Sequence, residues 1–166
     1  MKPGLLLIFF AVLFLLTCQI PTRITNPADY NPFLVEGAIQ SEVKQVQREL
    51  SFWQQRLQRD PANYIDMMKQ AACHQQLFRL RGEMDDCLAA DSLLKASTNR
   101  LHNTDPEILL ALSQHSITRH QFRKAYAYTE LAIGSKSDPY ITTLLQFDAA
   151  MELGEFVLAA GLLQSI

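Results

Sequence analysis

Breaks in the predicted helices recur at a nearly constant spacing through the carboxyl-terminal two thirds of the chain. Three Asp-Pro pairs stand there, at Asp60-Pro61, Asp105-Pro106 and Asp138-Pro139. Aspartate at an N-cap accepts hydrogen bonds from free backbone amides, and proline suits the first helical position because it has no amide to leave unpaired. We therefore expect a helix to begin at each pair.

Each segment that follows a pair is expected to hold two helices with a break between them. The breaks fall near Gly82, His120 and Gly154. Their spacing, roughly 34–38 residues, is typical of stacked helical hairpins. The sequence therefore predicts an all-α fold in which residues 60–166 form about two and a half hairpins.

The hairpin from Pro106 to Pro139 resembles a tetratricopeptide repeat, a helix-turn-helix unit of about 34 residues, which we call the repeat length. Ala125 and Ala132 of its second helix match the positions where that family has small residues, which let two helices approach closely. The other matching positions are Leu109, Leu112, Ser113 and Phe122. The resemblance covers residues 60–166 and implies a short right-handed α-solenoid.

The last segment repeats this pattern, because Gly154, Phe156 and Ala159 each follow their counterparts in the preceding hairpin by one repeat length. It departs from the family at Phe147, where a small residue is expected. It also reaches Ile166 before its second helix attains the family's length. The sequence thus predicts a partial third hairpin.

The first hairpin is the least regular, and two registers of its second helix remain open. In one register Cys87 and Leu94 stand at the small-residue positions, which would bury Asp91. In the other, Ala90 and Leu94 face inward. Cys73 and Cys87 either form a disulfide between facing helices or are two buried, small apolar residues.

Residues 36–59 are predicted to form one amphipathic helix before the hairpins. Six apolar residues recur there at alternating intervals of four and three, as in an a/d seam. They are Ile39, Val43, Val46, Leu50, Trp53 and Leu57. The seam is expected to pack onto the next hairpin, and the alternative is that it pairs with the same seam of a second chain.

The amino terminus predicts a membrane-targeting segment over residues 1–18. Leu5 to Leu16 is an unbroken run of twelve apolar residues after Lys2, which is the layout of a secretory signal. Twelve helical residues span roughly 18 Å, less than the ~30 Å hydrocarbon core, although the uncharged stretch from Pro3 to Ile20 allows a short anchor. Either reading places the rest of the chain outside the cytoplasm.

Cys18 is a candidate lipidation site. The residues Leu15-Leu16-Thr17-Cys18 resemble a bacterial lipoprotein signal, which implies cleavage before the cysteine and acylation of it. Thr17 departs from that pattern, which usually has glycine, alanine or serine before the cysteine. A lipoprotein, an uncleaved anchor and simple secretion therefore all remain open.

Residues 19–35 are expected to be an extended tether. Pro27 and Pro32 directly follow Asn26 and Asn31, and residues before proline avoid the helical region. At about 3.1 Å per residue such a segment separates a folded unit from a membrane by roughly 50 Å.

Composition and motifs argue against catalysis and against nucleic acid binding. The chain has 15 basic and 17 acidic residues and a formal net charge of -2, so it lacks the basic excess that neutralises phosphates. No phosphate-binding glycine loop, nucleophile elbow or His-Glu-x-x-His motif is present. The four histidines are expected at the surface or at helix ends, and no metal or cofactor is predicted.

The resemblance to tetratricopeptide repeats also implies a protein-binding groove, because those arrays present the first helix of each hairpin on a concave face. The family's groove positions carry over to Glu107, Leu110, Gln114, Ile117, Ile141, Leu144, Asp148 and Met151. A mixed apolar and polar groove suits an extended or helical peptide. The alternative is that the apolar members pack against a neighbouring helix.

These features predict a non-catalytic scaffold of the cell envelope, associated with a membrane through its amino terminus, that binds a protein partner. One alternative is a homo-oligomer formed through the seam of residues 39–57, with the hairpins as spacers. Another is the amino-terminal part of a longer protein whose active region lies beyond Ile166.

Overall fold

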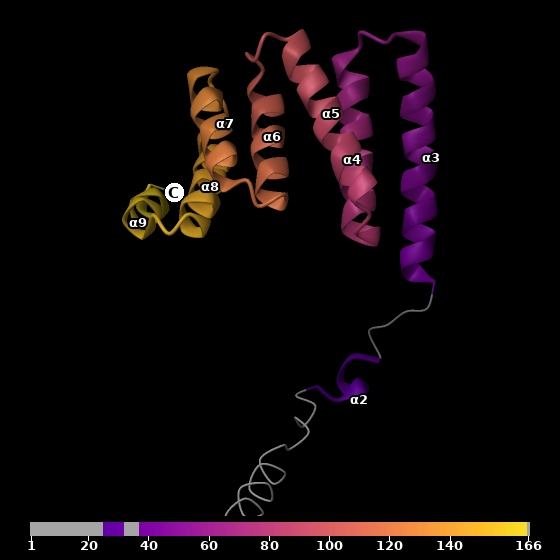
Figure 1. The fold of residues 1–166 in the computed structure, drawn as a ribbon, viewed down its shortest axis with the longest axis horizontal. Helices are drawn as coiled ribbons and strands as arrows, with labels where there is room; N and C mark the ends of the chain where they lie inside the picture. The colour runs from indigo at the N-terminus through magenta and orange to yellow at the C-terminus, as the bar shows by residue number, and fades with distance from the viewer. Residues whose placement is uncertain (1–24, 32–36, 166) are drawn as a thin grey trace, which may run out of the picture. The chain divides into compact units, whose positions relative to one another are not determined.

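The computed structural model describes residues 25–31 and 37–165, and its regular structure there is entirely α-helical (Figure 1). This confirms the all-α prediction. The helices are α2 (Pro27–Tyr30), α3 (Ala38–Arg59), α4 (Tyr64–Arg81), α5 (Met84–Arg100), α6 (Pro106–Thr118), α7 (Phe122–Gly134), α8 (Pro139–Glu152) and α9 (Phe156–Gln164). The chain divides into two compact units, residues 1–38 and residues 39–166.

The first unit contains the short helix α2 where an extended tether was predicted, so that prediction is wrong for Pro27–Tyr30. Asn26 itself is extended (φ −91°, ψ 130°), as expected before proline, but its side chain accepts a hydrogen bond from the Ala28 amide at 3.1 Å. The Asn-Pro pair therefore starts a helix by the same capping chemistry that we expected of the Asp-Pro pairs. Asn31 also has helical backbone angles (φ −53°, ψ −37°).

The predicted signal or anchor segment, Cys18 and the remainder of the tether lie outside the described residues. Among the residues that the structure describes, no helix is both long and apolar enough to cross a membrane.

In the second unit, α3 is the helix predicted over residues 36–59, and its seam packs against α4. Val46 and Leu50 are buried in one apolar cluster with Cys73 and Leu77 of α4. Ile39, at the start of the seam, is 56% exposed. The middle of the seam is thus covered within the chain.

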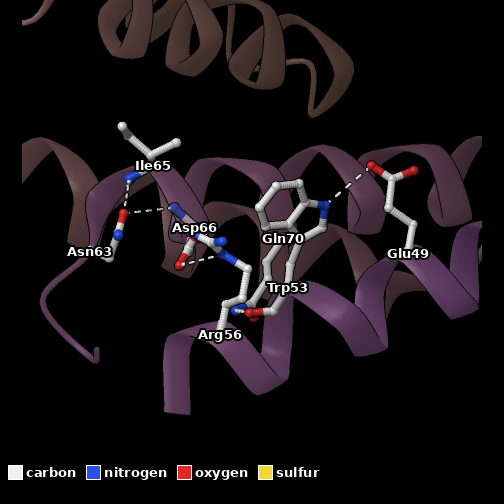
Figure 2. Close-up of polar contacts among 7 residues, drawn as sticks. All are labelled: Glu49, Trp53, Arg56, Asn63, Ile65, Asp66 and Gln70. Atoms are coloured by element: carbon white, nitrogen blue, oxygen red, sulfur yellow. Dashed lines mark hydrogen bonds and ion pairs between the residues drawn. The ribbon is translucent and has the colours of Figure 1, made fainter. Parts of the chain in front are cut away.

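The Asp60-Pro61 pair does not begin a helix, so that prediction is wrong. The Asp60 amide still donates to the Arg56 carbonyl, which makes Asp60 the end of the α3 hydrogen-bond pattern, and its carboxylate accepts from the Ala62 amide in the following turn. Asn63 is the N-cap of α4 instead, and its side chain accepts from two backbone amides at 3.1 and 3.2 Å (Figure 2).

The other two Asp-Pro pairs begin helices as predicted. The Asp105 carboxylate accepts from the Ile108 amide at 3.1 Å and begins α6, and the Asp138 carboxylate accepts from the Ile141 amide at 3.0 Å and begins α8.

The three predicted breaks are turns whose central residue has a positive φ: Gly82 (70°), His120 (54°) and Gly154 (77°). Another pair of residues with positive φ, His102 and Lys136, lies one repeat length apart in the turns that precede α6 and α8. Residues with positive φ therefore recur at the repeat length both within hairpins, at His120 and Gly154, and between hairpins, at His102 and Lys136.

Neighbouring helices of the second unit pack in sequence order. α4 contacts α5, α6 contacts α7 and α8 contacts α9, while α5 also contacts α6 and α8 contacts both α6 and α7 (Figure 1). Small side chains lie at these contacts, because Ala125, Ala132 and Ala159 are all essentially inaccessible to solvent.

The buried face of α5 includes the inward residues of both registers that the sequence left open, Cys87, Ala90 and Leu94. Asp91 lies at the margin of this face, where its carboxylate pairs with Lys95 at 2.6 Å and with Arg119 at 2.9 Å. A partner for the carboxylate thus allows an acid at a position that is usually apolar.

Cys73 and Cys87 are free and buried, which matches the interpretation as small apolar residues. Burial raises the pKa of the Cys73 thiol to about 11. This thiol is therefore protonated at neutral pH and is a poor nucleophile.

Candidate functional site

A groove runs between α6 and α8 and brings together six of the eight predicted binding residues. We call it the α6–α8 groove; its volume is about 730 Å³. The predicted residues that line it are Glu107, Leu110, Gln114, Ile141, Leu144 and Asp148. Such a volume is in the range of ordinary ligand-binding clefts.

Helical periodicity explains why these six residues share one surface. Glu107, Leu110 and Gln114 are spaced by three and four residues, which places them on one face of α6. The opposite face of that helix buries Ile108 and Leu112 in the apolar core with residues of α4 and α5. The three residues of α8 have the same spacing.

Ile117 and Met151, the other two predicted positions, do not line this groove. Ile117 is partly buried near the end of α6, and Met151 is 42% exposed near the end of α8. Both lie one turn beyond the residues that form the groove wall.

The structure adds groove residues that the sequence prediction missed. They are Pro106, Ala111, Lys136, Ser137, Asp138 and Leu145. Lys136 and Ser137 come from the turn that leads into α8, whereas the family positions that we carried over are confined to the first helix of each hairpin. Lys136 has a positive φ of 62°, but neither Lys136 nor Ser137 is a residue type that predicts this backbone conformation.

The charges of the groove are mainly acidic. Glu107 and Asp148 are exposed, and neither forms an ion pair among the described residues. Asp138 also lines the groove, but its carboxylate is engaged as the N-cap of α8. Among the described residues that line the groove, Lys136 is the single basic one.

The apolar part of the groove is formed by leucine and isoleucine side chains that remain accessible. Ile141 is 47% exposed, and Leu110 and Leu144 are partly buried. Packing between α6 and α8 therefore does not bury these side chains completely, and they leave apolar surface that another molecule can contact.

A second, smaller hollow lies between α4 and α6, with a volume of about 50 Å³. Its lining residues are Gln75, Phe78, Arg79, Gln114, His115 and Thr118. Gln114 borders both hollows, so one continuous surface extends from α4 across α6 to α8. The groove positions predicted from the sequence include none in α4.

His115 lies in the last turn of α6, one of the two kinds of position expected for the histidines, and it is buried there. Its Nδ1 lies 3.4 Å from the Gln75 side-chain nitrogen, and its Nε2 has no hydrogen-bond partner among the described residues. Burial lowers the pKa of His115 below 6.5, more strongly than the Asp91 carboxylate raises it. The ring is therefore neutral at pH 7.

His74 also has a structural partner, because its Nδ1 lies 2.8 Å from the Asp86 carboxylate, which Arg81 contacts as well. Burial raises the pKa of Asp86, but the hydrogen bonds from Arg81 and His74 outweigh it and hold that pKa below its usual value. This cluster joins the end of α4 to the start of α5. Among the described residues, no group of three or more His, Cys, Asp or Glu side chains could hold a metal ion.

Comparison with protein-family models, with curated protein sequences and with solved structures gives no match for this chain.

Proposed function

We propose that this chain is a non-catalytic interaction module that holds a peptide segment of a partner protein in the α6–α8 groove. The observation that carries the proposal is that six residues chosen from the sequence as binding positions line one accessible, partly apolar groove. Grooves of this kind bind extended or helical peptides through apolar anchors and a few polar contacts.

The proposal includes a tetratricopeptide-like solenoid built from the hairpins α4–α5, α6–α7 and α8–α9. The turn residues with positive φ at His120 and Gly154, one repeat length apart, support it. So do the buried alanines Ala125 and Ala132 of α7 and Ala159 of α9, at the small positions of that family.

We also propose that the amino-terminal segment holds the chain at a membrane and places the groove outside the cytoplasm. The support is the apolar run from Leu5 to Leu16 followed by Cys18. Cys18→Ser tests the lipoprotein form: loss of fatty-acid labelling is expected, and unchanged labelling together with unchanged membrane retention would reject it.

Homo-oligomerisation through the α3 seam is less well supported. Val46 and Leu50, in the middle of the seam, are already buried against α4. A second chain could pair with them only by displacing α4.

Affinity capture from solubilised membranes, with Ile141→Glu as the test variant, examines the groove. Glutamate in the first turn of α8 suits the helix N-terminus, so the fold should survive while an apolar anchor of the groove becomes charged. Leu158→Glu is the matched control, because Leu158 is the third residue of α9 as Ile141 is of α8, is 42% exposed, similar to Ile141, and does not line the groove.

The proposal predicts that Ile141→Glu loses its main partner while Leu158→Glu retains it. Circular dichroism should show the same helix content in both variants. Equal capture by the two variants would contradict the groove as the binding site.

A further inference from the structure

We infer that the α6–α8 groove selects peptide segments with apolar side chains at the centre and a lysine or arginine at the Asp148 end. This inference rests on the proposed function and specifies the ligand of the same groove. It follows from where the charges of the groove wall lie along α6 and α8.

The two helices run in the same general direction, because α7 returns the chain between them (Figure 1). The repeat length pairs Glu107 with Ile141, Leu110 with Leu144, and Gln114 with Asp148. Seven helical residues separate the first level from the last, which corresponds to about 10 Å. The groove thus has two ends and an apolar centre.

The two ends differ in charge. The Glu107 end also holds Asp138, whose carboxylate caps the N-terminus of α8, and Lys136, which lies in the turn before α8. The N-termini of α6 and α8 lie at this end and favour its carboxylates.

Asp148 has Gln114 beside it at the other end, where the described residues of the groove wall include no basic side chain. The exposed Arg79 belongs to the adjoining hollow that Gln114 also borders. Glu152, one turn further along α8, is also exposed and adds negative charge.

A peptide that fills the apolar centre therefore meets, at one end, two carboxylates that lie at helix N-termini beside a lysine. At the Asp148 end it meets a carboxylate that has neither a lysine of the groove wall nor a helix N-terminus beside it. A basic side chain there gains Coulomb attraction and a hydrogen-bonded partner, whereas an acidic one meets a like charge. Because the pair is exposed, the gain is modest, and we expect about a two- to fivefold change in Kd.

The test uses the full-length chain in detergent and a displayed library of random peptides of about twelve residues as the probe. Selected peptides are remeasured by fluorescence anisotropy against wild type, Asp148→Asn and Glu107→Gln. Asp85→Asn is the control of equal charge change, because Asp85 is an exposed residue of α5 without an ion pair among the described residues.

We expect enrichment of apolar peptides with a basic residue at one end. Asp148→Asn should weaken their binding about two- to fivefold, and the loss should shrink as salt is raised. Glu107→Gln should have a smaller effect, and Asp85→Asn should have none.

Two outcomes would overturn the inference, and they are distinguishable. If Ile141→Glu abolishes binding of the selected peptides but these are neutral or acidic and insensitive to Asp148→Asn, the charge assignment is wrong and the groove remains. If no selected peptide is sensitive to Ile141→Glu, the proposed function fails and the inference fails with it.

Discussion

Arg56 of α3 donates from its Nε to both carboxylate oxygens of Asp66 of α4, at 3.1 and 3.2 Å (Figure 2). The two partners differ in environment, because the side chain of Asp66 is 3% exposed and that of Arg56 is 48% exposed. The guanidinium carbon also lies 5.5 Å from the ring centroid of Trp53, whose backbone carbonyl accepts from the Gln70 side chain at 3.2 Å. Loss of the ion pair would therefore leave the Asp66 carboxylate buried without a donor, whereas water could still solvate the Arg56 guanidinium.

Arg56→Ala is expected to lower the free energy of unfolding by about 1–3 kcal/mol, because it leaves a buried carboxylate without its donor. Replacing Asp66 with alanine as well should cost less than the sum of the two single changes. Urea unfolding measures all three variants. Arg48→Ala, which removes an exposed arginine of the same helix, should change stability by less than about 0.5 kcal/mol. Simple additivity of the Arg56 and Asp66 effects would contradict this account.

The pH dependence of stability should report on His115. Since burial places the pKa of His115 in the folded state below 6.5, the unfolded chain takes up a proton at higher pH than the folded chain does. The contribution of His115 is complete above about pH 6.5 and is lost as the pH falls toward the folded-state pKa. His115→Gln should therefore show a smaller fall in Tm between about pH 7.5 and about pH 5 than wild type.

His102→Asn is the control for that experiment, because His102 is exposed in a turn with φ 51°, a conformation that asparagine tolerates. It should keep the pH dependence of wild type. The lowered pKa of Asp86 acts in a different window, because that carboxylate loses its contribution only as the pH falls below about 4. Equal falls in Tm for wild type and His115→Gln would refute the assignment.

Two glycine substitutions should have effects of opposite sign. Gly154 has φ 77°, and a methyl group there would meet no neighbouring atom, so the cost of Gly154→Ala comes from the backbone and should be about 1–2 kcal/mol. Gly161 lies inside α9 with equally open surroundings. Gly161→Ala should therefore stabilise the chain by about 0.5–1 kcal/mol. Thermal unfolding measures both changes, and destabilisation by both would be inconsistent with these backbone conformations.

Replacing capping residues with alanine tests whether Asn63, and not Asp60, is the N-cap of α4. Asn63→Ala removes the acceptor of two helix amides and should cost about 1 kcal/mol. Asp60→Ala removes only a turn hydrogen bond and should cost about 0.5 kcal/mol or less. Denaturant titration measures the free energy of unfolding of both variants. A larger loss for Asp60→Ala than for Asn63→Ala would indicate that the Asp-Pro pair begins the helix.

Structural features that depend only on residues close together along the chain were predictable from the sequence. The caps at Asp105 and Asp138, the turn at Gly82 and the seam of α3 each follow from local hydrogen bonding, glycine conformation or helical periodicity. Two of the local predictions were wrong where two local rules competed. Asn26 was expected to belong to an extended segment, but its side chain caps a helix instead. Asp60 was expected to begin a helix, but its amide completes the hydrogen-bond pattern at the end of α3.

The residues expected in the groove came from the resemblance to tetratricopeptide repeats, and helical periodicity explains why six of them share one surface, because residues spaced by three and four lie on one helix face. The full wall of the groove was not predictable, because Lys136 and Ser137 reach it from a turn, and the position of a turn relative to two helices depends on how those helices pack.

The sequence by itself determined the helices and most of their ends, because each of these depends on interactions within a few residues along the chain, whereas the six groove residues came from the resemblance to tetratricopeptide repeats. Only the tertiary structure decided that α4 covers the α3 seam, that His115 is buried and that no basic residue lies beside Asp148 among the described residues of the groove wall. These properties arise from contacts between helices distant in sequence, and periodicity specifies which face of a helix is apolar but not which partner covers it.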